Sequence, residues 1–461
     1  MLAPRSLLIG LVLLGLTPLS CDRSRPPNVL MIVIDTLRAD RVGVYGNRRG
    51  LTPFIDSVAA RGVAFLDAYS VSSWTCPSVA SLLTSRYPAQ HHVISFVSKL
   101  PDDEITLAEK LEPLRYVSGG FSANFRLLQS LGYAQGFQFW QADVETGNGV
   151  PASVLRAQGL EWLDRAWQPS SGRPAFLYFQ FMEPHAPYEP AEPFRSRFQT
   201  GNGDAAEVNQ KLVGLRWHEL TRADTALLES LYDGEVATVD EELRLLFDEL
   251  ERRGFLQNAI VIITADHGEE FWEHGNLSHG TTLYNESVHV PLIVQAPGAV
   301  AGRRIEENVS LVDVAPTVLD LVGFPPEPRF EGRSLAPLLR AEPAGNESQR
   351  RAPNSREPED VLLQLEWQGY GFDTREHVSG IVRRDTKVLL RPNGLPEAYD
   401  LATDPGEKHA NADGIAAQSD ALMQTLAAAT TDLVHRAGTA SKADAIDQAT
   451  REKLRALGYH F

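Results

Sequence analysis

Three apolar runs in the chain have the length and composition of buried strands, and they cover residues 29–34, 175–181 and 259–264. The first is continuously apolar and rich in β-branched side chains, which is typical of a parallel strand covered on both faces. Segments with helical periodicity lie around and between them: 52–62, 106–111, 154–167 and 223–253. This alternation of strand and helix predicts a layered α/β fold.

Polar side chains follow each of the three predicted strands. Asp35 ends the first strand, His185 comes shortly after the second, and Asp266 and His267 come after the third. In an open α/β sheet, ligands bind at the carboxyl ends of the strands. These residues are therefore placed for chemistry, and carboxylate and imidazole groups are suitable ligands for a divalent cation.

The composition changes near residues 341–358, which are rich in Pro, Glu, Arg and Ser and contain no large apolar residue. We interpret this segment as a linker or exposed loop between a large domain, 28–340, and a small α+β domain, 359–461. The expected elements of the small domain are three short strands and a helix, at 361–367, 377–382, 386–390 and 412–434.

The N-terminus has the pattern of an export signal. Arg5 precedes an apolar run at 7–16, which is too short to span a membrane but suits a signal-peptide core. The run ends near Cys21 in a sequence that resembles the lipobox of bacterial lipoproteins, apart from Pro18. We expect residues 1–21 to be a signal peptide, 22–27 a linker, and a lipid on Cys21 to tether the chain to a membrane in the cell envelope or periplasm. Ordinary cleavage and a soluble exported protein are the alternative.

Composition excludes several classes of protein. Hydrophobic residues make up 43% of the 461 residues and charged residues 22%, so the chain is not mainly disordered. The net charge of -17 argues against a nucleic-acid partner. With Cys21 and Cys76 as the two cysteines, neither a disulfide framework nor a cysteine-built zinc site is expected. An anionic substrate would need a local cation, such as a metal ion.

Several segments resemble the sulfatase family of the alkaline phosphatase superfamily: 28–45, 73–88, 264–271, 309–321, 330–338 and 399–407. The resemblance implies a three-layer α/β sandwich around a large mixed sheet, with a small C-terminal α+β domain. It also implies a hydrolase of anionic esters in which Asp35, Asp266 and His267 bind one divalent metal ion.

The chain departs from the sulfatase pattern at the nucleophile. Aligned on Pro77 and Ser78, the motif places Thr75 where sulfatases carry the residue that is oxidised to formylglycine, and Val79 replaces the motif's arginine. Threonine is not expected to undergo that oxidation. Thr75 is instead a candidate metal-bound nucleophile that attacks the ester directly, as in the phosphotransferring relatives that this part of the chain resembles. Thr36 replaces a second Asp, which favours zinc or manganese over calcium.

Two histidines complete the candidate site. His185 resembles the family's ligand for a substrate oxygen, and His279 lies where sulfatases usually carry a lysine and could protonate the leaving group. We interpret the remaining histidines of interest, His91, His92 and His274, as solvated loop residues.

Other polar residues have structural interpretations. We expect Asp233, Glu235 and Asp240 to form a solvated helix face. Asp313 is expected to cap a helix, and Thr75 could also be the N-cap of a helix that begins at Pro77.

The sequence thus predicts a metal-dependent hydrolase of sulfate or phosphate esters. Three alternatives remain open: a phosphoryl-group transferase acting on envelope polymers or lipids, a true sulfatase that uses Cys76 or Thr75 in another way, and an inactive sulfatase-like binding protein.

Overall fold

A computed structural model of the chain describes residues 25–142, 149–340, 359–368, 375–391, 395–411 and 415–437. The predicted signal peptide with Cys21, and the predicted linker at 341–358, lie outside these ranges. The domain boundaries placed there therefore remain predictions. In the part of the chain that is described, no helix has both the length and the apolar character needed to cross a membrane.

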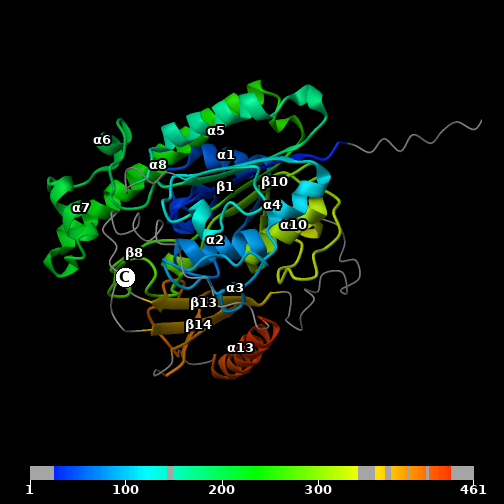
Figure 1. Ribbon diagram of the computed structural model, residues 1–461. Helices are drawn as coiled ribbons and strands as arrows, with labels where there is room; N and C mark the ends of the chain where they lie inside the picture. The colour runs from blue at the N-terminus through cyan, green and yellow to red at the C-terminus, as the bar shows by residue number, and fades with distance from the viewer. Residues whose placement is uncertain are drawn as a thin grey trace, which may run out of the picture.

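An eight-stranded mixed sheet forms the centre of the molecule, in the order β11-β2-β10-β7-β1-β6-β4-β5 (Figure 1). Its strands are β1 Asn28–Ile34, β2 Val63–Phe65, β4 Val117–Ser122, β5 Phe139–Ala142, β6 Ala175–Phe181, β7 Ala259–Thr264, β10 Leu292–Gln295 and β11 Arg303–Ile305. The central strand β1 pairs in parallel with β6 on one side and with β7 on the other. Strand β10 is antiparallel to β7, which makes the sheet mixed.

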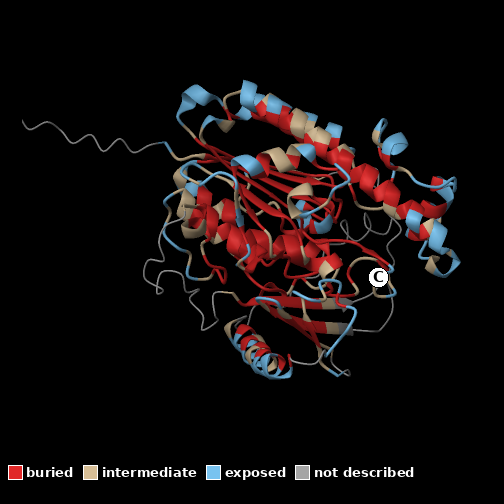
Figure 2. Ribbon diagram, turned by 180° about the vertical axis from the view of Figure 1, so that it is seen from behind, coloured by how far each residue is buried: buried red, intermediate tan, exposed pale blue. Residues whose placement is uncertain are grey.

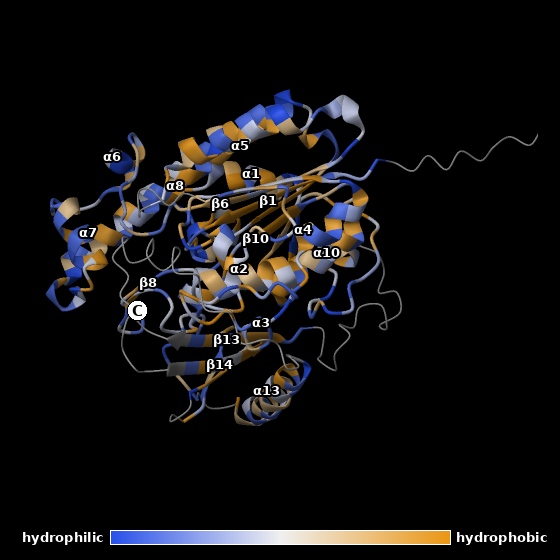
Figure 3. Ribbon diagram, viewed as in Figure 1, coloured by the Kyte–Doolittle hydropathy of each residue, from blue (hydrophilic) through white to orange (hydrophobic). Residues whose placement is uncertain are grey.

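Helices cover both faces of this sheet (Figure 1). One layer contains α1 Pro53–Arg61, α5 Ala152–Ala166 and α8 Arg222–Arg252, and the other contains α2 Thr75–Thr84, α4 Leu107–Leu111 and α10 Val314–Leu321. Figure 2 shows the central strands buried and the exposed residues gathered on outer helices and loops. The same strands are the most apolar part of the chain in Figure 3, as expected for a sheet covered on both faces.

Short elements complete the large unit. They are the helices α3 Pro88–His91, α6 Phe194–Phe198, α7 Ala205–Val213, α9 Asn285–Val288 and α11 Ala336–Arg340, and the strand pairs β3 Ala68–Tyr69 with β12 Val309–Ser310 and β8 Glu270–Phe271 with β9 Leu277–Ser278. Asp313 caps the turn before α10, where its carboxylate accepts the backbone N–H of Ser310 at 3.0 Å. This agrees with the expected capping role.

A separate antiparallel sheet lies beside the α2 layer and is covered on its outer side by α13 Ala416–Ala437 (Figure 1). It contains β13 Val361–Gln368, β14 Arg375–Arg383, β15 Thr386–Leu390 and β16 Glu397–Asp400. The predicted three-layer α/β fold with a small α+β C-terminal unit is confirmed.

One sequence-based expectation about α8 is wrong. Asp233, Glu235 and Asp240 are buried, with exposed fractions of 0%, 4% and 3%. Other helices pack along α8, so the face that local periodicity assigns to solvent is covered. Asp233 pairs with Arg41 and Arg49, while Asp240 accepts two backbone N–H groups from the first turn of α1, at 2.9 and 2.8 Å.

Candidate active site

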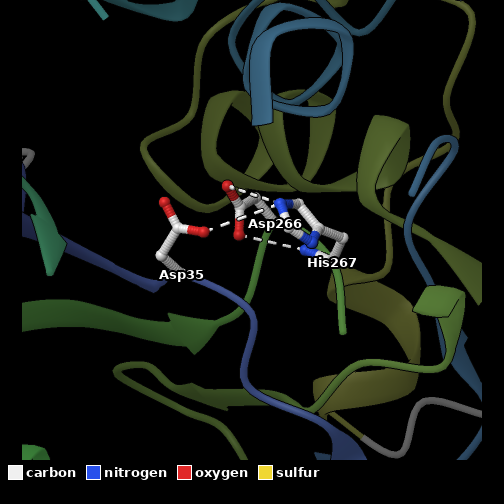
Figure 4. Close-up of side chains that lie close together, drawn as sticks. All are labelled: Asp35, Asp266 and His267. Atoms are coloured by element: carbon white, nitrogen blue, oxygen red, sulfur yellow. Dashed lines mark hydrogen bonds and ion pairs between the residues drawn. The ribbon is translucent and has the colours of Figure 1, made fainter. Parts of the chain in front are cut away.

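Three elements bring four of the predicted site residues together. Asp35 follows β1, Asp266 and His267 follow β7, and Thr75 begins α2. Figure 4 shows the two carboxylates and the imidazole turned toward one another. His267 Nε2 lies 3.6 Å from Asp35 Oδ1, 3.7 Å from Asp266 Oδ2 and 3.3 Å from Thr75 Oγ1. The residues are distant in sequence but form one buried cluster.

The chemistry of this cluster fits a divalent cation. His267 Nδ1 donates to the Gly268 carbonyl at 2.9 Å, which leaves the lone pair of Nε2 facing the carboxylates. Asp35 Oδ1 is buried and has no hydrogen-bond partner among the described residues. A lone pair and two carboxylates that face each other repel unless a cation lies between them. Ligand atoms around a tetrahedral zinc ion are about 3.3 Å apart, close to the spacings observed here.

Burial shifts the pKa values of all three groups. The pKa values of the two acids rise, and a bound cation would lower them again. Desolvation, with the charge of Asp266 nearby, raises the pKa of Asp35 to about 6. Desolvation raises the pKa of Asp266 to about 7 and lowers that of His267 to about 4. His267 is therefore neutral near pH 7, the protonation state in which imidazole binds metals.

Two amide residues that the sequence analysis did not identify also contact the cluster. Asn124, just after β4, donates from Nδ2 to Asp35 Oδ2 at 2.6 Å and to Thr75 Oγ1 at 3.4 Å. Gln180, within β6, donates from Nε2 to Asp266 Oδ2 at 3.1 Å and to Asp35 Oδ2 at 3.4 Å. The only signal in the sequence for Gln180 was a single polar residue in an apolar strand.

Thr75 is the first residue of α2, and its hydroxyl points into the cluster. Trp74 is the N-cap residue and makes no side-chain capping bond, so the interpretation of Thr75 as the helix cap is wrong. Ser78 fixes this helix end, because its hydroxyl donates to the Asp266 carbonyl at 2.5 Å. Cys76 is buried away from water, which raises its pKa to about 11. A thiol at such a pKa is a poor nucleophile near pH 7.

Thr36, which follows Asp35, has a φ of 57°. This left-handed conformation is costly for a β-branched residue, and such strain concentrates at functional sites. The backbone N–H of Thr36 points at Asp266 Oδ1, 3.4 Å away. The turn after β1 therefore contributes a backbone donor to the cluster, while the Thr36 hydroxyl has no partner in the described part of the chain.

The two predicted catalytic histidines lie beside the cluster. The His279 ring is 4.4 Å from that of His267 and 5.0 Å from that of His185, measured between ring centroids. Glu269 Oε1 is 2.9 Å from His279 Nδ1, and its other oxygen accepts the Tyr188 hydroxyl at 3.0 Å. His185 Nδ1 donates to the Ala186 carbonyl at 2.6 Å. The Nδ1 atom of each ring thus makes a hydrogen bond within the protein, and the Nε2 atom of each ring is available to groups in the site.

A cavity of about 350 Å³ adjoins the site at His185. Its apolar wall includes Met182 and Pro187, and its polar wall is acidic: Glu183, Glu189, Glu235 and Glu242. A cavity next to a reactive centre is the natural place for the organic part of a substrate.

The interpretation of the other histidines as solvated is wrong for two of them. His91 is fully buried and lies 3.0 Å from the Ser81 hydroxyl. His274 lies between Glu286 and the Glu407 carbonyl, with Nδ1 2.5 Å from Glu286 Oε1 and Nε2 3.0 Å from the carbonyl. Both have structural partners, and neither reaches the Asp35 cluster.

Comparison with known proteins gives consistent results. A family model described as Sulfatase matches residues 27–324. Arylsulfatase K of Gallus gallus is 26% identical over 88% of this chain and 83% of its own length. The fold is similar to that of a phosphonate monoester hydrolase of Agrobacterium radiobacter, with a TM-score of 0.70, 21% identity, and coverage of 89% of this chain and 96% of that one.

A second solved structure, a protein in complex with its substrate D-glucosamine-2-N,6-O-disulfate, has a TM-score of 0.73 and 20% identity. The similarity covers 91% of this chain and 100% of that one. At these identities the two structures support the fold.

Proposed function

Since the chain belongs to the sulfatase family, we propose that it is a metal-dependent hydrolase of sulfate or phosphate esters in which Thr75 is the nucleophile. The observation that carries the proposal is the position of the Thr75 hydroxyl, 3.3 Å from His267 Nε2 and beside two buried carboxylates. The names of the relatives support ester hydrolysis: an arylsulfatase and a phosphonate monoester hydrolase.

Asp35, Asp266, His267 and Thr75 would hold the metal ion. When bound, the ion would neutralise the anionic ester and lower the pKa of the Thr75 hydroxyl. The ligand set of two carboxylates, one imidazole and one hydroxyl favours zinc or manganese over calcium, which prefers six or more oxygens.

In the first step the Thr75 hydroxyl, having lost its proton to solvent, attacks sulfur or phosphorus through its oxygen, and the bond to the alcohol oxygen breaks. His279 gives a proton to that oxygen. Burial holds the pKa of free His279 at about 3, but the Glu269 carboxylate beside Nδ1 and an incoming anionic ester both favour the protonated ring. Water then cleaves the threonine ester while His279, now neutral, takes a proton from the water; this releases sulfate or phosphate and restores both Thr75 and the protonated His279. His185, which borders the cavity, orients a nonbridging oxygen.

The proposed location of the protein in the cell rests on the N-terminal sequence. We propose that the chain is exported and is anchored by a lipid on Cys21, so that its substrates lie in the cell envelope or outside it. Mass spectrometry of the mature N-terminus tests this part separately from catalysis.

The catalytic proposal is tested with aryl sulfate, aryl phosphate and aryl phosphodiester substrates, each with added manganese, zinc or calcium. Thr75→Ala is expected to lower kcat by at least about a thousandfold, as removal of a nucleophile does in other hydrolases. Cys76→Ala, which changes the adjacent side chain, is the matched control and should retain activity. Loss of activity in Cys76→Ala with retention in Thr75→Ala would reject Thr75 as the nucleophile, and an aldehyde at either position would point to a formylglycine mechanism.

A further inference from the structure

The carboxamides of Asn124 and Gln180 lie behind the two carboxylates of the candidate metal centre. Their exposed fractions are 2% and 0%. Asn124 Nδ2 and Gln180 Nε2 both donate to Asp35 Oδ2, at 2.6 and 3.4 Å. Gln180 Nε2 also donates to Asp266 Oδ2 at 3.1 Å. Neutral amide donors therefore link the two acids.

The orientation of each amide is fixed by a second hydrogen bond. The backbone N–H of Arg126 donates to Asn124 Oδ1 at 2.9 Å. The Tyr178 hydroxyl donates to Gln180 Oε1 at 2.7 Å. With both oxygens engaged in this way, the NH₂ groups must face the carboxylates. Residues that form hydrogen bonds to metal ligands on the side away from the metal usually fix the orientation of those ligands and tune the properties of the bound metal.

This arrangement has consequences for the atoms that remain available. The amides engage Asp35 Oδ2 and leave Asp35 Oδ1, which has no partner within the described ranges, directed toward His267 Nε2. Because amides carry no charge, the cluster has two negative charges when both acids are ionised, which matches one dication. A carboxylate in place of either amide would add a third charge and further oxygen ligands.

We propose that Asn124 and Gln180 are positioning residues that hold Asp35 and Asp266 in the metal-binding orientation, and that Gln180 biases the site against calcium. The inference rests on the metal centre proposed above. Glu at position 180 is nearly isosteric with Gln and can still accept the Tyr178 hydroxyl. The substitution Gln180→Glu would remove both N–H donors and provide the oxygen-rich surroundings that calcium prefers.

The test measures metal binding to the EDTA-treated full chain by titration calorimetry with manganese, zinc and calcium separately. Gln180→Leu is expected to weaken manganese and zinc binding about 10- to 100-fold. Gln180→Glu is expected to increase calcium affinity relative to manganese affinity by about tenfold or more. The matched control is Gln364→Glu, which changes a glutamine of the small sheet that is 2% exposed and whose side-chain oxygen accepts a backbone N–H.

Thermal unfolding with and without each metal is a second readout that does not depend on turnover. Gln180→Glu should gain more stability from calcium than the unchanged protein does, because the ion relieves repulsion among three carboxylates. If Gln180→Leu does not fold, Asn124→Ser removes the shorter amide contact and should weaken manganese binding in the same direction.

The outcomes separate the two proposals. An unchanged protein that binds none of the three ions rejects the metal centre, and the inference with it. If the unchanged protein binds metal but the variants at 180 and 124 behave like Gln364→Glu, the inference alone is overturned.

Discussion

Glu235 provides a test of the electrostatics of the cavity beside the site. Its side chain, on α8, is 4% exposed and accepts the backbone N–H of Glu189 at 2.6 Å. Burial, with the nearby Glu183 carboxylate, raises its pKa from 4.5 to about 8. No ion pair to Glu235 occurs within the described residues. We therefore predict that Glu235 is protonated in the folded protein near pH 7.

This prediction has a definite sign for stability. The pKa of Glu235 is higher in the folded state than in the unfolded state, so the folded protein holds more protons between about pH 4.5 and pH 8. The Glu235 contribution to the free energy of unfolding must fall as the pH rises through this window. At about 1.4 kcal/mol per pKa unit, the loss reaches roughly 5 kcal/mol at pH 8 as an upper value, before relaxation of the structure.

Glu235→Gln imitates the protonated acid and should remove this dependence. Urea unfolding from pH 5 to pH 8.5 should show the variant becoming progressively more stable than the unchanged protein, because titrating groups that do not interact with Glu235 cancel in the difference. Glu241→Gln, a partly exposed neighbour on α8 that pairs with Arg244, is the control and should not give such a rise. A difference between Glu235→Gln and the unchanged protein that stays flat, or that falls with pH, would refute the argument.

Three further predictions follow from the site and the sheet. Removal of metal with EDTA should abolish activity and lower the thermal midpoint, and manganese or zinc should restore both; unchanged turnover after complete removal would contradict the proposed chemistry. His279→Gln should slow esters of poor leaving groups, such as alkyl alcohols, far more than nitrophenyl esters, and an equal loss for both would argue against proton donation. Gly120→Ala should cost about 1–3 kcal/mol, because its Cβ would lie 2.2 Å from the Trp140 ring; an unchanged urea midpoint would show that the ring can move aside.

The site residues that could be predicted from the sequence are those that follow a strand with a clear apolar pattern. Three apolar runs predicted β1, β6 and β7, and two of the predicted ranges, 175–181 and 259–264, agree with the structure to the residue. The polar residues after these strands could be placed at one sheet edge because parallel strands share a direction. Asp35, Asp266 and His267 can be identified in this way from the residues alone.

Strand β4 and its contribution to the site could not be predicted in the same way. Its sequence includes Gly119 and Gly120, which interrupt the apolar pattern. The structure explains both glycines, because the rings of Trp162 and Trp140 occupy the space that side chains would need, at 2.8 and 2.2 Å from the ideal Cβ positions. Because β4 needs glycines where the two indole rings pack against it, its sequence shows no apolar periodicity. Asn124, which follows this strand, could therefore not be identified from the sequence.

The burial of the acidic residues of α8 could not be predicted from the sequence for a different reason. Periodicity along a helix identifies which residues share a face, but it does not show whether a second element covers that face. Here α1, α5, α6 and α7 all contact α8. The acids on it therefore serve as buried partners for backbone N–H groups and arginines.

The acids around the cavity also bear on which esters the site can accept. Four ionised carboxylates around the cavity would oppose an anionic substrate, since two like charges 4 Å apart repel by about 4 kcal/mol at an effective dielectric constant near 20. Arg156 neutralises Glu242 across 2.8 Å, and a protonated Glu235 removes a second charge. Burial also raises the pKa of Glu183. Among the described residues, the lining of the cavity contains four acids and no Lys or Arg, so the cavity still disfavours a second anionic group on the alcohol. We infer that the anionic ester group is directed to the Asp35 cluster and that a neutral alcohol portion occupies the cavity beside His185.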